Sequence, residues 1–273
     1  MKLKFSILLL ISITLFFSSC EDVIEVDVPE AEPRLVIDAA FHRFFDNGQP
    51  RSEGVVRLTL SGPFFDNTIQ PALGATVRII NVQDERVLEF NDESGDGNYF
   101  ANFVPEFDRD YRLEIEYEGE LYTATERMQP TGDLIDIAFG DKTFLTEDTR
   151  ELKISFQDVP DMRNYYFFNL DEGNFLVSDD EFYADNIFPF SYFYEDLESG
   201  DTLDIQLFGS TPQFNTFLDA LLIQSGEMGG SGGPFSVPPA AVKGNIVNRT
   251  NPDHFPFGFY RVSEGTSIEV TVP

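Results

Sequence analysis

Alternating apolar and polar residues recur along most of the chain and predict short β-strands. In the clearest case, residues 111–117, apolar side chains alternate with arginine and glutamate. Successive side chains of a strand point to opposite faces of a sheet, so this segment has one apolar face and one charged face. The same period of two appears at residues 56–60, 77–79, 152–156, 203–207 and 268–272. Glycine, proline, asparagine and aspartate separate these segments, which is typical of the turns of a β-sandwich.

Residues 212–225 depart from this pattern and predict one amphipathic helix. Apolar residues there follow the spacing i, i+3, i+4, i+7 and i+8: Phe214, Phe217, Leu218, Leu221 and Leu222. Such spacing places them on one face of a helix, which we expect to pack on the core. Thr211 is placed to cap the N-terminus and Pro212 to occupy the first helical position. The glycine-rich run that follows the helix predicts a flexible loop.

An interruption at residues 129–133 predicts a boundary between two domains. Proline, threonine and glycine stand there between two strand-rich regions. We therefore predict a mainly β fold with two antiparallel β-sandwich domains, residues 34–130 and residues 131–273, the second carrying the helix. The first would have about 100 residues, which is the size of an immunoglobulin-like sandwich.

The first 19 residues have the order of a secretory signal peptide. Lys2 and Lys4 precede an apolar run from residue 5 to residue 17, and two serines then stand before Cys20. This run is shorter than the roughly 20 apolar residues that a transmembrane helix needs. We therefore predict that residues 1–19 are a signal peptide and not a permanent membrane anchor.

Cys20 is the only cysteine, so a disulfide within the chain is excluded. Its position resembles a bacterial lipobox, in which the thiol is acylated and becomes the new N-terminus, although Phe17 stands where leucine is usual. The resemblance implies a lipid anchor, and each buried CH₂ of its acyl chains contributes about 0.8 kcal/mol to membrane binding. Cleavage by an ordinary signal peptidase, which would leave a free thiol, is the alternative.

The segment behind Cys20 is acidic and punctuated by proline. Glu21 and Asp22 resemble the surface-export signal of outer-membrane lipoproteins in some Gram-negative lineages. Residues 20–33 also have the composition of a solvated tether, and the two interpretations are compatible. We therefore expect a protein that is lipid-anchored at the outer membrane and exposed at the cell surface.

The net charge of −30 limits the partners of this chain. Such a chain repels phosphate backbones and anionic lipid surfaces, so we expect neither nucleic-acid binding nor membrane binding through a basic patch. Aromatic residues make up 14% of the sequence and can supply a core, which argues against disorder despite the charge.

The acidic loop that begins at Asp92 is the strongest candidate metal site. Asp92, Ser94 and Asp96 place oxygen atoms at alternate positions and Gly97 stands sixth, as in the first half of a calcium-binding loop. The twelfth position, however, is Phe103 where a bidentate glutamate belongs. A hairpin turn is the alternative, because Asx and glycine residues adopt the positive φ angles of tight turns. We expect no other cofactor.

Candidate catalytic patterns are less specific. Residues 229–233 satisfy G-x-S-x-G, with His254 and Asp253 as a base and its orienting acid, but the run follows a predicted helix where a hydrolase requires a strand. Neighbouring carboxylates could serve as the acid and base of glycoside cleavage: Asp179 with Asp180, and Glu195 with Asp196. Such neighbours arise by chance among 48 acidic residues. We therefore expect a protein that is not an enzyme.

An aromatic stretch runs from Phe188 to Tyr194. Core strands of a sandwich use such residues, and planar rings also stack on sugars or on partner proteins. We favour the core, and we keep Phe190, Tyr192, Phe193 and Tyr194 as candidate ligand or partner contacts. Asn248-Arg249-Thr250 formally satisfies an N-glycosylation sequon, which is a pattern short enough to occur by chance.

Several short motifs resemble known families when they are taken in order. Gly74–Val77, Gly97–Phe100 and Tyr111–Leu113 are similar to the transthyretin-like or carboxypeptidase-regulatory sandwich pattern. The opening residues 20–23 and 33–37, with the block at residues 233–260, resemble a lipoprotein family catalogued as domain of unknown function four-two-four-nine. This resemblance implies an outer-membrane lipoprotein whose genes often sit beside TonB-dependent receptors. It implies no established activity and no catalytic residues.

The sequence thus favours a non-enzymatic accessory lipoprotein. We expect it to bind a TonB-dependent receptor or the nutrient that this receptor imports. Capture of a glycan or peptide on the aromatic surface of the second half is one alternative. A surface hydrolase that uses carboxylates is the alternative from another class.

Overall fold

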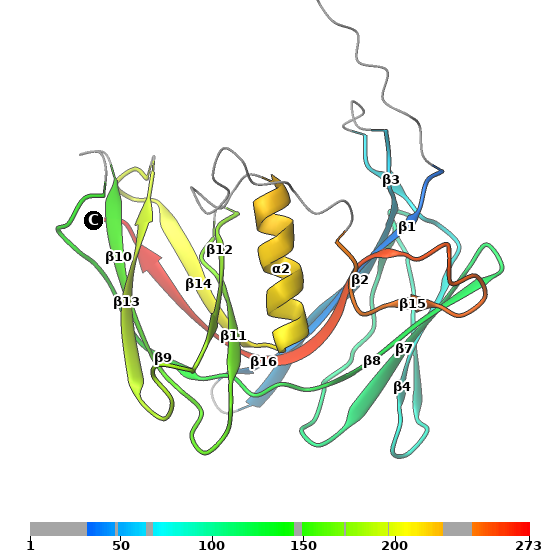
Figure 1. Ribbon diagram of the computed structural model, residues 1–273, viewed down its shortest axis with the longest axis horizontal. Coiled ribbons are helices and arrows are strands. Elements are labelled where there is room, and N and C mark those ends of the chain that lie inside the picture. The colour runs from blue at the N-terminus through cyan, green and yellow to red at the C-terminus, as the bar shows by residue number, and fades with distance from the viewer. Residues whose placement is uncertain are drawn as a thin grey trace, which may run out of the picture. The chain divides into compact units, whose positions relative to one another are not determined.

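The described residues form a mainly β protein with one helix, as the alternating pattern predicts (Figure 1). The computed structural model describes residues 32–46, 49–63, 68–144, 149–171, 173–195, 197–225 and 242–273. One compact unit comprises Pro33–Gly62 and Asn67–Pro273. The predicted signal peptide, Cys20, Glu21 and Asp22 lie outside the described residues.

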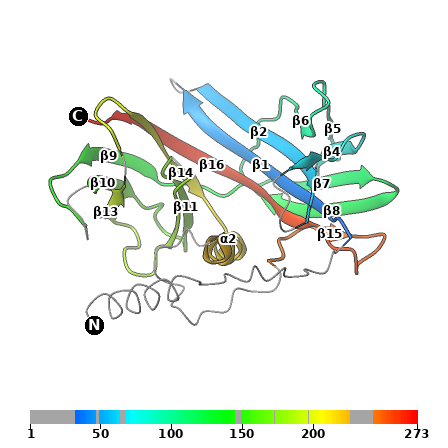
Figure 2. The same cartoon turned by 90° about the horizontal axis from the view of Figure 1, so that it is seen from above.

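The largest sheet has eight strands and runs the length of this unit. Its members are β1 (Leu35–Asp46), β2 (Gln49–Leu60), β3 (Gln70–Pro71), β6 (Asn98–Tyr99), β11 (Tyr165–Asn169), β12 (Phe175–Asp179), β14 (Thr202–Gly209) and β16 (Phe257–Thr271). Their order is β12-β11-β14-β16-β1-β2-β3, and β6 also pairs with β2. Figure 2 shows β16 lying beside β1 in this sheet.

Strand β16 connects the two halves of the eight-stranded sheet. Its first part pairs in parallel with β1, from Phe257 opposite Val36 to Glu264 opposite Arg43. Its last part pairs antiparallel with β14, from Gly265 to Thr271. The C-terminal strand therefore contributes to the packing of both halves of the chain.

Two smaller sheets cover parts of the large one. Five strands are ordered β15-β8-β7-β4-β5: β4 (Thr76–Asn81), β5 (Val87–Phe90), β7 (Asp110–Tyr117), β8 (Glu120–Arg127) and β15 (Val247–Asn248). Three strands are ordered β13-β10-β9: β9 (Asp133–Phe139), β10 (Arg150–Gln157) and β13 (Ile187–Tyr194). The boundary predicted at residues 129–133 falls between the end of β8 and the start of β9, where Gln129 bridges to Ser263 of β16.

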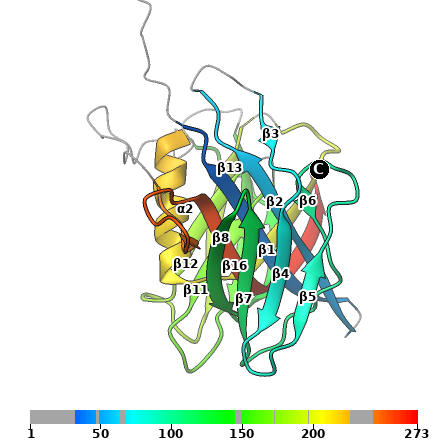
Figure 3. The ribbon, with the colours of Figure 1, turned by 90° about the vertical axis from the view of Figure 1, so that its right-hand side faces the viewer.

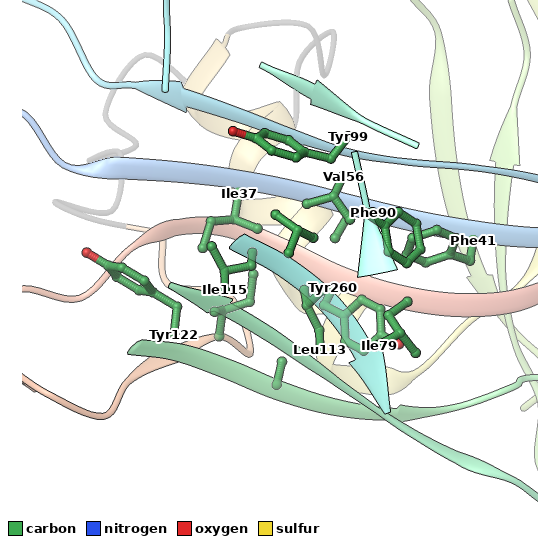
Figure 4. Close-up of a cluster of buried hydrophobic side chains, with 14 of the residues drawn as sticks. Ile37, Phe41, Val56, Ile79, Phe90, Tyr99, Leu113, Ile115, Tyr122 and Tyr260 are labelled. Carbon is green, nitrogen blue, oxygen red and sulfur yellow. The ribbon is translucent and has the colours of Figure 1, made fainter. Parts of the chain in front are cut away.

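The first core lies between the five-stranded sheet and β1, β2 and β16 (Figure 3). The predicted alternation of residues 111–117 is present in β7, where Tyr111, Leu113 and Ile115 are buried in this core. Tyr260 and Val262 of β16 join it from the C-terminal end of the chain. Figure 4 shows Leu113, Ile115 and Tyr260 gathered in one cluster with side chains of β1 and β2.

The second core lies between the three-stranded sheet and β11, β14 and the end of β16. Leu152, Ile154 and Phe156 of β10 are buried there together with Tyr166 and Phe168 of β11. The side chain of Phe156 makes edge-on ring contacts with Tyr166 and Phe168, each with centroids 5.3 Å apart. Such contacts add about 0.5–1.5 kcal/mol each beyond simple burial.

The predicted helix is present as α2 (Pro212–Ser225), with the predicted cap. The Thr211 hydroxyl accepts a hydrogen bond from the Phe214 N–H at 3.1 Å, which satisfies one of the free amides of the first turn. Phe214, Leu218 and Leu222 are buried in a third cluster, on the face of the large sheet opposite the second core. Figures 1 and 2 show the helix against this face.

Candidate functional site

The candidate site lies on one face of the large sheet, and the alternation of side chains along its strands determines which residues reach that face. Along β16, Tyr260 and Val262 enter the first core, whereas Phe259 packs with α2 and Arg261 lies on the same face as Phe259. Along β11, the neighbours of Phe167 enter the second core, and Phe167 itself packs with the helix. Along β1, Asp38 belongs to the same face. One helix thus covers a sheet face that carries aromatic rings and two opposite charges.

A cavity of about 560 Å³ lies between α2 and this face. Its walls are mainly phenylalanine: Phe167, Phe175, Phe214, Phe217, Phe257 and Phe259. Val36, Leu218, Leu221, Gln224, Val242 and Gly258 complete the lining with the two charged residues, Asp38 and Arg261. A concave, mostly apolar cavity with a few polar groups is the usual form of a small-molecule site.

Arg261 is a charged group in an apolar wall. Its guanidinium carbon lies 5.0 Å from the ring centroid of Phe214 and 5.7 Å from that of Phe167. Its Nη1 is 3.5 Å from Asp38 Oδ1, which is a long single contact. Its Nε is buried and has no hydrogen-bond partner among the described residues. Burial lowers the pKa of Arg261, and Asp38 partly opposes that shift.

Further cations lie beside the cavity. Phe255 is 5.7 Å from Phe257 between ring centroids, and Phe257 lines the cavity. The guanidinium carbon of Arg34 lies 4.2 Å from the Phe255 ring centroid, and Lys243 Nζ lies 3.8 Å from it. These are cation–π distances. Positive charge is therefore concentrated around this cavity in a chain whose net charge is strongly negative.

His42 lies on the same face of β1 as Asp38. Its Nδ1 is 2.8 Å from the Ser263 hydroxyl, and its ring centroid is 4.1 Å from that of Phe208. Burial holds the pKa of His42 well below its usual range, and the positive charge of Arg261 adds to this effect. The imidazole is therefore neutral near pH 7 and does not compete with Arg261 for an anion.

A second cavity, of about 610 Å³, borders β10 and is lined by both polar and apolar groups. Glu151 lies in its wall with a fully buried side chain. The Ser191 hydroxyl donates to Glu151 Oε1 at 2.7 Å and the Lys142 N–H donates to Oε2 at 3.1 Å. The Ser191 hydrogen bond is the main reason that the pKa of Glu151 is lowered. A carboxylate held ionised in this way is poorly suited to donate a proton.

The candidate calcium loop is organised by its own backbone. The Asp92 carboxylate accepts hydrogen bonds from the N–H groups of Gly95, Asp96 and Gly97, at 2.8, 3.2 and 2.9 Å. Gly95 and Gly97 have φ angles of 66° and 81°. These are the features of the alternative interpretation, a tight turn. The described residues contain no group of three His, Cys, Asp or Glu side chains arranged to hold a metal ion.

The candidate aromatic contacts of β13 pack mainly on the second core. Tyr194 is buried there, and Phe190 and Tyr192 pack against it. Phe193 instead contacts Phe144, with ring centroids 5.4 Å apart. This packing agrees with the core role, while Phe190, Tyr192 and Phe193 remain partly exposed.

The candidate catalytic carboxylates Asp179 and Asp180 both contact Arg163, and their other contacts are with the main chain. Asp180 is buried and accepts the Asn164 N–H at 2.8 Å, and Asp179 pairs with Arg163 at 2.7 Å. Residues 229–233 and Asp196 lie outside the described residues. His254 contacts Glu120 at 2.9 Å, in a network that also holds the side-chain amide of buried Asn248.

Arg261 and Asp38 are not among the site residues predicted from the sequence. They are 223 positions apart, and only the parallel pairing of β1 with β16 brings them together. A local signal was present at residues 257–262, where aromatic residues continue on both faces of the strand and a single arginine interrupts them. A strand that is apolar on both faces is covered on both sides, so its one charge is placed among apolar neighbours.

Solved structures with similarity to this chain include three of low identity. A DUF4785 family protein of Legionella pneumophila is 11% identical, with 64% of this chain and 52% of that chain covered and a TM-score of 0.23. The FN1–FN3 domains of chicken CNTN1 are 10% identical, with 67% and 62% covered and a TM-score of 0.21. The chicken interferon gamma receptor alpha chain is 10% identical, with 66% and 89% covered and a TM-score of 0.18. This chain therefore spans less than two thirds of the length of the first two of these structures.

A family model matches most of the chain. In contrast, no curated protein matches the chain. None of the helices in the described part of the chain is both long and apolar enough to cross a membrane. The family model described as a domain of unknown function, DUF4249, matches residues 21–269, which confirms the resemblance seen in the motifs. The chain belongs to the DUF4249 family.

Proposed function

We propose that this protein is a non-catalytic, lipid-anchored accessory protein of the outer membrane that captures a ligand for a TonB-dependent receptor. The observation that carries the binding part is the cavity of about 560 Å³ between α2 and the large sheet. Its size falls within the roughly 300–1,000 Å³ of ligand sites in proteins, and its wall combines aromatic surface with a charged pair.

The anchor is supported by the sequence at Cys20. A charged, apolar and small-residue order precedes this cysteine, and the family match begins at the next residue, Glu21. The acidic residues behind it support export to the cell surface. An acylated Cys20 would hold the body at the membrane without a basic patch, which agrees with the net charge of −30.

The contacts that the charged groups make support a protein without catalytic activity. Catalytic acids and bases are placed within hydrogen-bond reach of a reacting group and have pKa values suited to proton transfer. Asp179, Asp180, Glu151 and His254 instead bind main-chain amides or other side chains. These contacts give the four groups a structural role in turns and at the ends of sheets.

The anchor is tested by replacing Cys20 with Ala and fractionating the cells. We expect the Cys20→Ala protein in the soluble periplasmic fraction, while a Ser19→Ala control stays with the membrane. Membrane association of the Cys20→Ala protein would disprove the anchor.

The accessory role is tested by gentle solubilisation of the native membrane and mass spectrometry of the proteins that copurify. A TonB-dependent receptor should be recovered in an amount comparable to the lipoprotein. Recovery of the lipoprotein without any receptor, under conditions that preserve other outer-membrane complexes, would contradict the accessory role.

A further inference from the structure

The charged and apolar groups that line the cavity beside α2 restrict the class of ligand that it can bind. Among the described residues, two charged side chains line it, and their exposures differ: 24% for the Arg261 side chain and 55% for that of Asp38. Asp38 is therefore largely hydrated, whereas Arg261 is largely withdrawn from water. The charge that a ligand would meet inside the apolar wall is the positive one.

The guanidinium of Arg261 has unused donors. An arginine side chain offers five N–H donors in a planar fork that matches a carboxylate. Within the described residues, the guanidinium donates one hydrogen bond, to Asp38 Oδ1 at 3.5 Å, and the buried Nε has no acceptor. A carboxylate that binds with two oxygens would satisfy these donors and offset the cost of burying the charge.

The rest of the wall favours an apolar ligand body. Six phenylalanine rings line the cavity, and two of them, Phe167 and Phe214, lie beside the guanidinium of Arg261. A peptide carries an N–H and a C=O at every residue, and these groups need partners when they are buried. The aromatic wall offers few such partners. A simple hydrocarbon chain with one carboxylate makes no such demand.

We propose that the cavity beside α2 binds a fatty-acid-like amphiphile, with its carboxylate on Arg261 and its hydrocarbon chain among the phenylalanine rings. Arg34 and Lys243, stacked on Phe255 next to the cavity, add positive charge that attracts such an anion. The proposal deepens the binding function proposed above and rests on it, because it names the ligand class of the same cavity.

The test compares three probes of equal chain length on the full chain carrying Cys20→Ala, which removes the native acyl group as a competitor. Decanoate, 1-decanol and decylammonium are titrated below their micellar concentrations, and binding is followed by calorimetry. We expect one site, with decanoate binding at least tenfold more tightly than decylammonium. This comparison requires no substitution in the cavity.

Substitutions then locate the carboxylate. Arg261→Met should weaken decanoate binding about tenfold or more, as expected for loss of a charge-assisted hydrogen bond, and should leave 1-decanol within threefold. Asp38→Asn removes the competing carboxylate and should tighten decanoate binding. Arg112→Met removes the same charge from the five-stranded sheet and should change nothing. Leu221→Trp narrows the cavity and should weaken binding of decanoate and 1-decanol alike.

The outcomes separate this inference from the function on which it rests. Equal binding of the three probes, or decanoate binding that is unchanged in Arg261→Met, would overturn the carboxylate assignment and leave the cavity as an apolar binding site. Failure of all three probes to bind would overturn both the ligand class and the binding function of the cavity.

Discussion

Tyr260 provides a test of the packing between β16 and the five-stranded sheet. The side chain is fully buried in the first core, yet its hydroxyl has no hydrogen-bond partner among the described residues. Burial raises the pKa of Tyr260 well above its usual value, and the nearby charge of Glu126 adds to the shift. The hydroxyl is therefore a polar group that loses its hydration on folding and gains no hydrogen bond.

Replacing Tyr260 with Phe removes that hydroxyl and keeps the ring. A buried polar group without a partner costs about 1–3 kcal/mol, so Tyr260→Phe should raise the free energy of unfolding by about 1 kcal/mol or more. For domains of 150–250 residues, each kcal/mol corresponds to roughly 2–4 °C in melting temperature. Denaturant unfolding followed by tyrosine fluorescence, and calorimetry, measure both quantities.

Tyr166 supplies the matched control. It is also fully buried, but its hydroxyl donates to Asp158 Oδ1 at 2.5 Å and accepts the Val159 N–H at 3.0 Å. Tyr166→Phe should therefore lower the free energy of unfolding by about 1.5–3 kcal/mol, because a hydrogen bond to a charged group is lost. If Tyr260→Phe destabilises the protein as much as Tyr166→Phe does, the description of the Tyr260 environment is wrong.

Three further predictions concern stability. Burial raises the pKa of Glu126 to about 7, so its ionisation disfavours folding as the pH rises from about 4.5 through 7. At pH 8, Glu126→Gln should therefore add about 1–3 kcal/mol to the free energy of unfolding. This stabilisation should disappear at pH 4, where Glu126 is protonated in both the folded and the unfolded chain. Thr211→Ala removes the cap of α2 and should cost about 1 kcal/mol in denaturant unfolding, whereas the exposed Thr216→Ala should stay within about 0.5 kcal/mol of the parent. Gly258→Ala should lower the melting temperature more than Gly119→Ala, because both positions have positive φ but only the first lacks space for a Cβ atom.

Local features of the fold were predictable because they are encoded within a few residues. The alternation at residues 111–117 became β7, and the spacing at residues 212–225 became α2 with Thr211 as its cap. Period, capping and turn chemistry act over one or two turns of chain, so the sequence displays them directly. The mainly β class follows from the same signals.

The candidate site was not predictable because it depends on pairing between distant segments. Nothing local indicates that β16 pairs in parallel with β1, or that Ala40 lies opposite Arg261 in that register. Asp180 and Asn248 show the same limit, because both were singled out as parts of sequence motifs and both are buried in the fold. As sequence motifs they suggested carboxylate chemistry and a glycosylation sequon, but in the fold Asn248 is buried and its amide donates to Glu120. Burial decides the role of such groups, and burial is a tertiary property.

Gly258 shows why the fold and the cavity are difficult to separate. A Cβ atom at this position would lie 2.0 Å from the main-chain oxygen of Ile37, so β16 can approach β1 only if residue 258 has no side chain. The same glycine lines the cavity, together with residues of both β1 and β16. Close pairing of the two strands therefore also positions one wall of the cavity. A substitution at Gly258 would disturb both properties together, so the binding proposal has to be tested at Arg261 and Leu221, which face the cavity without holding the strands in register.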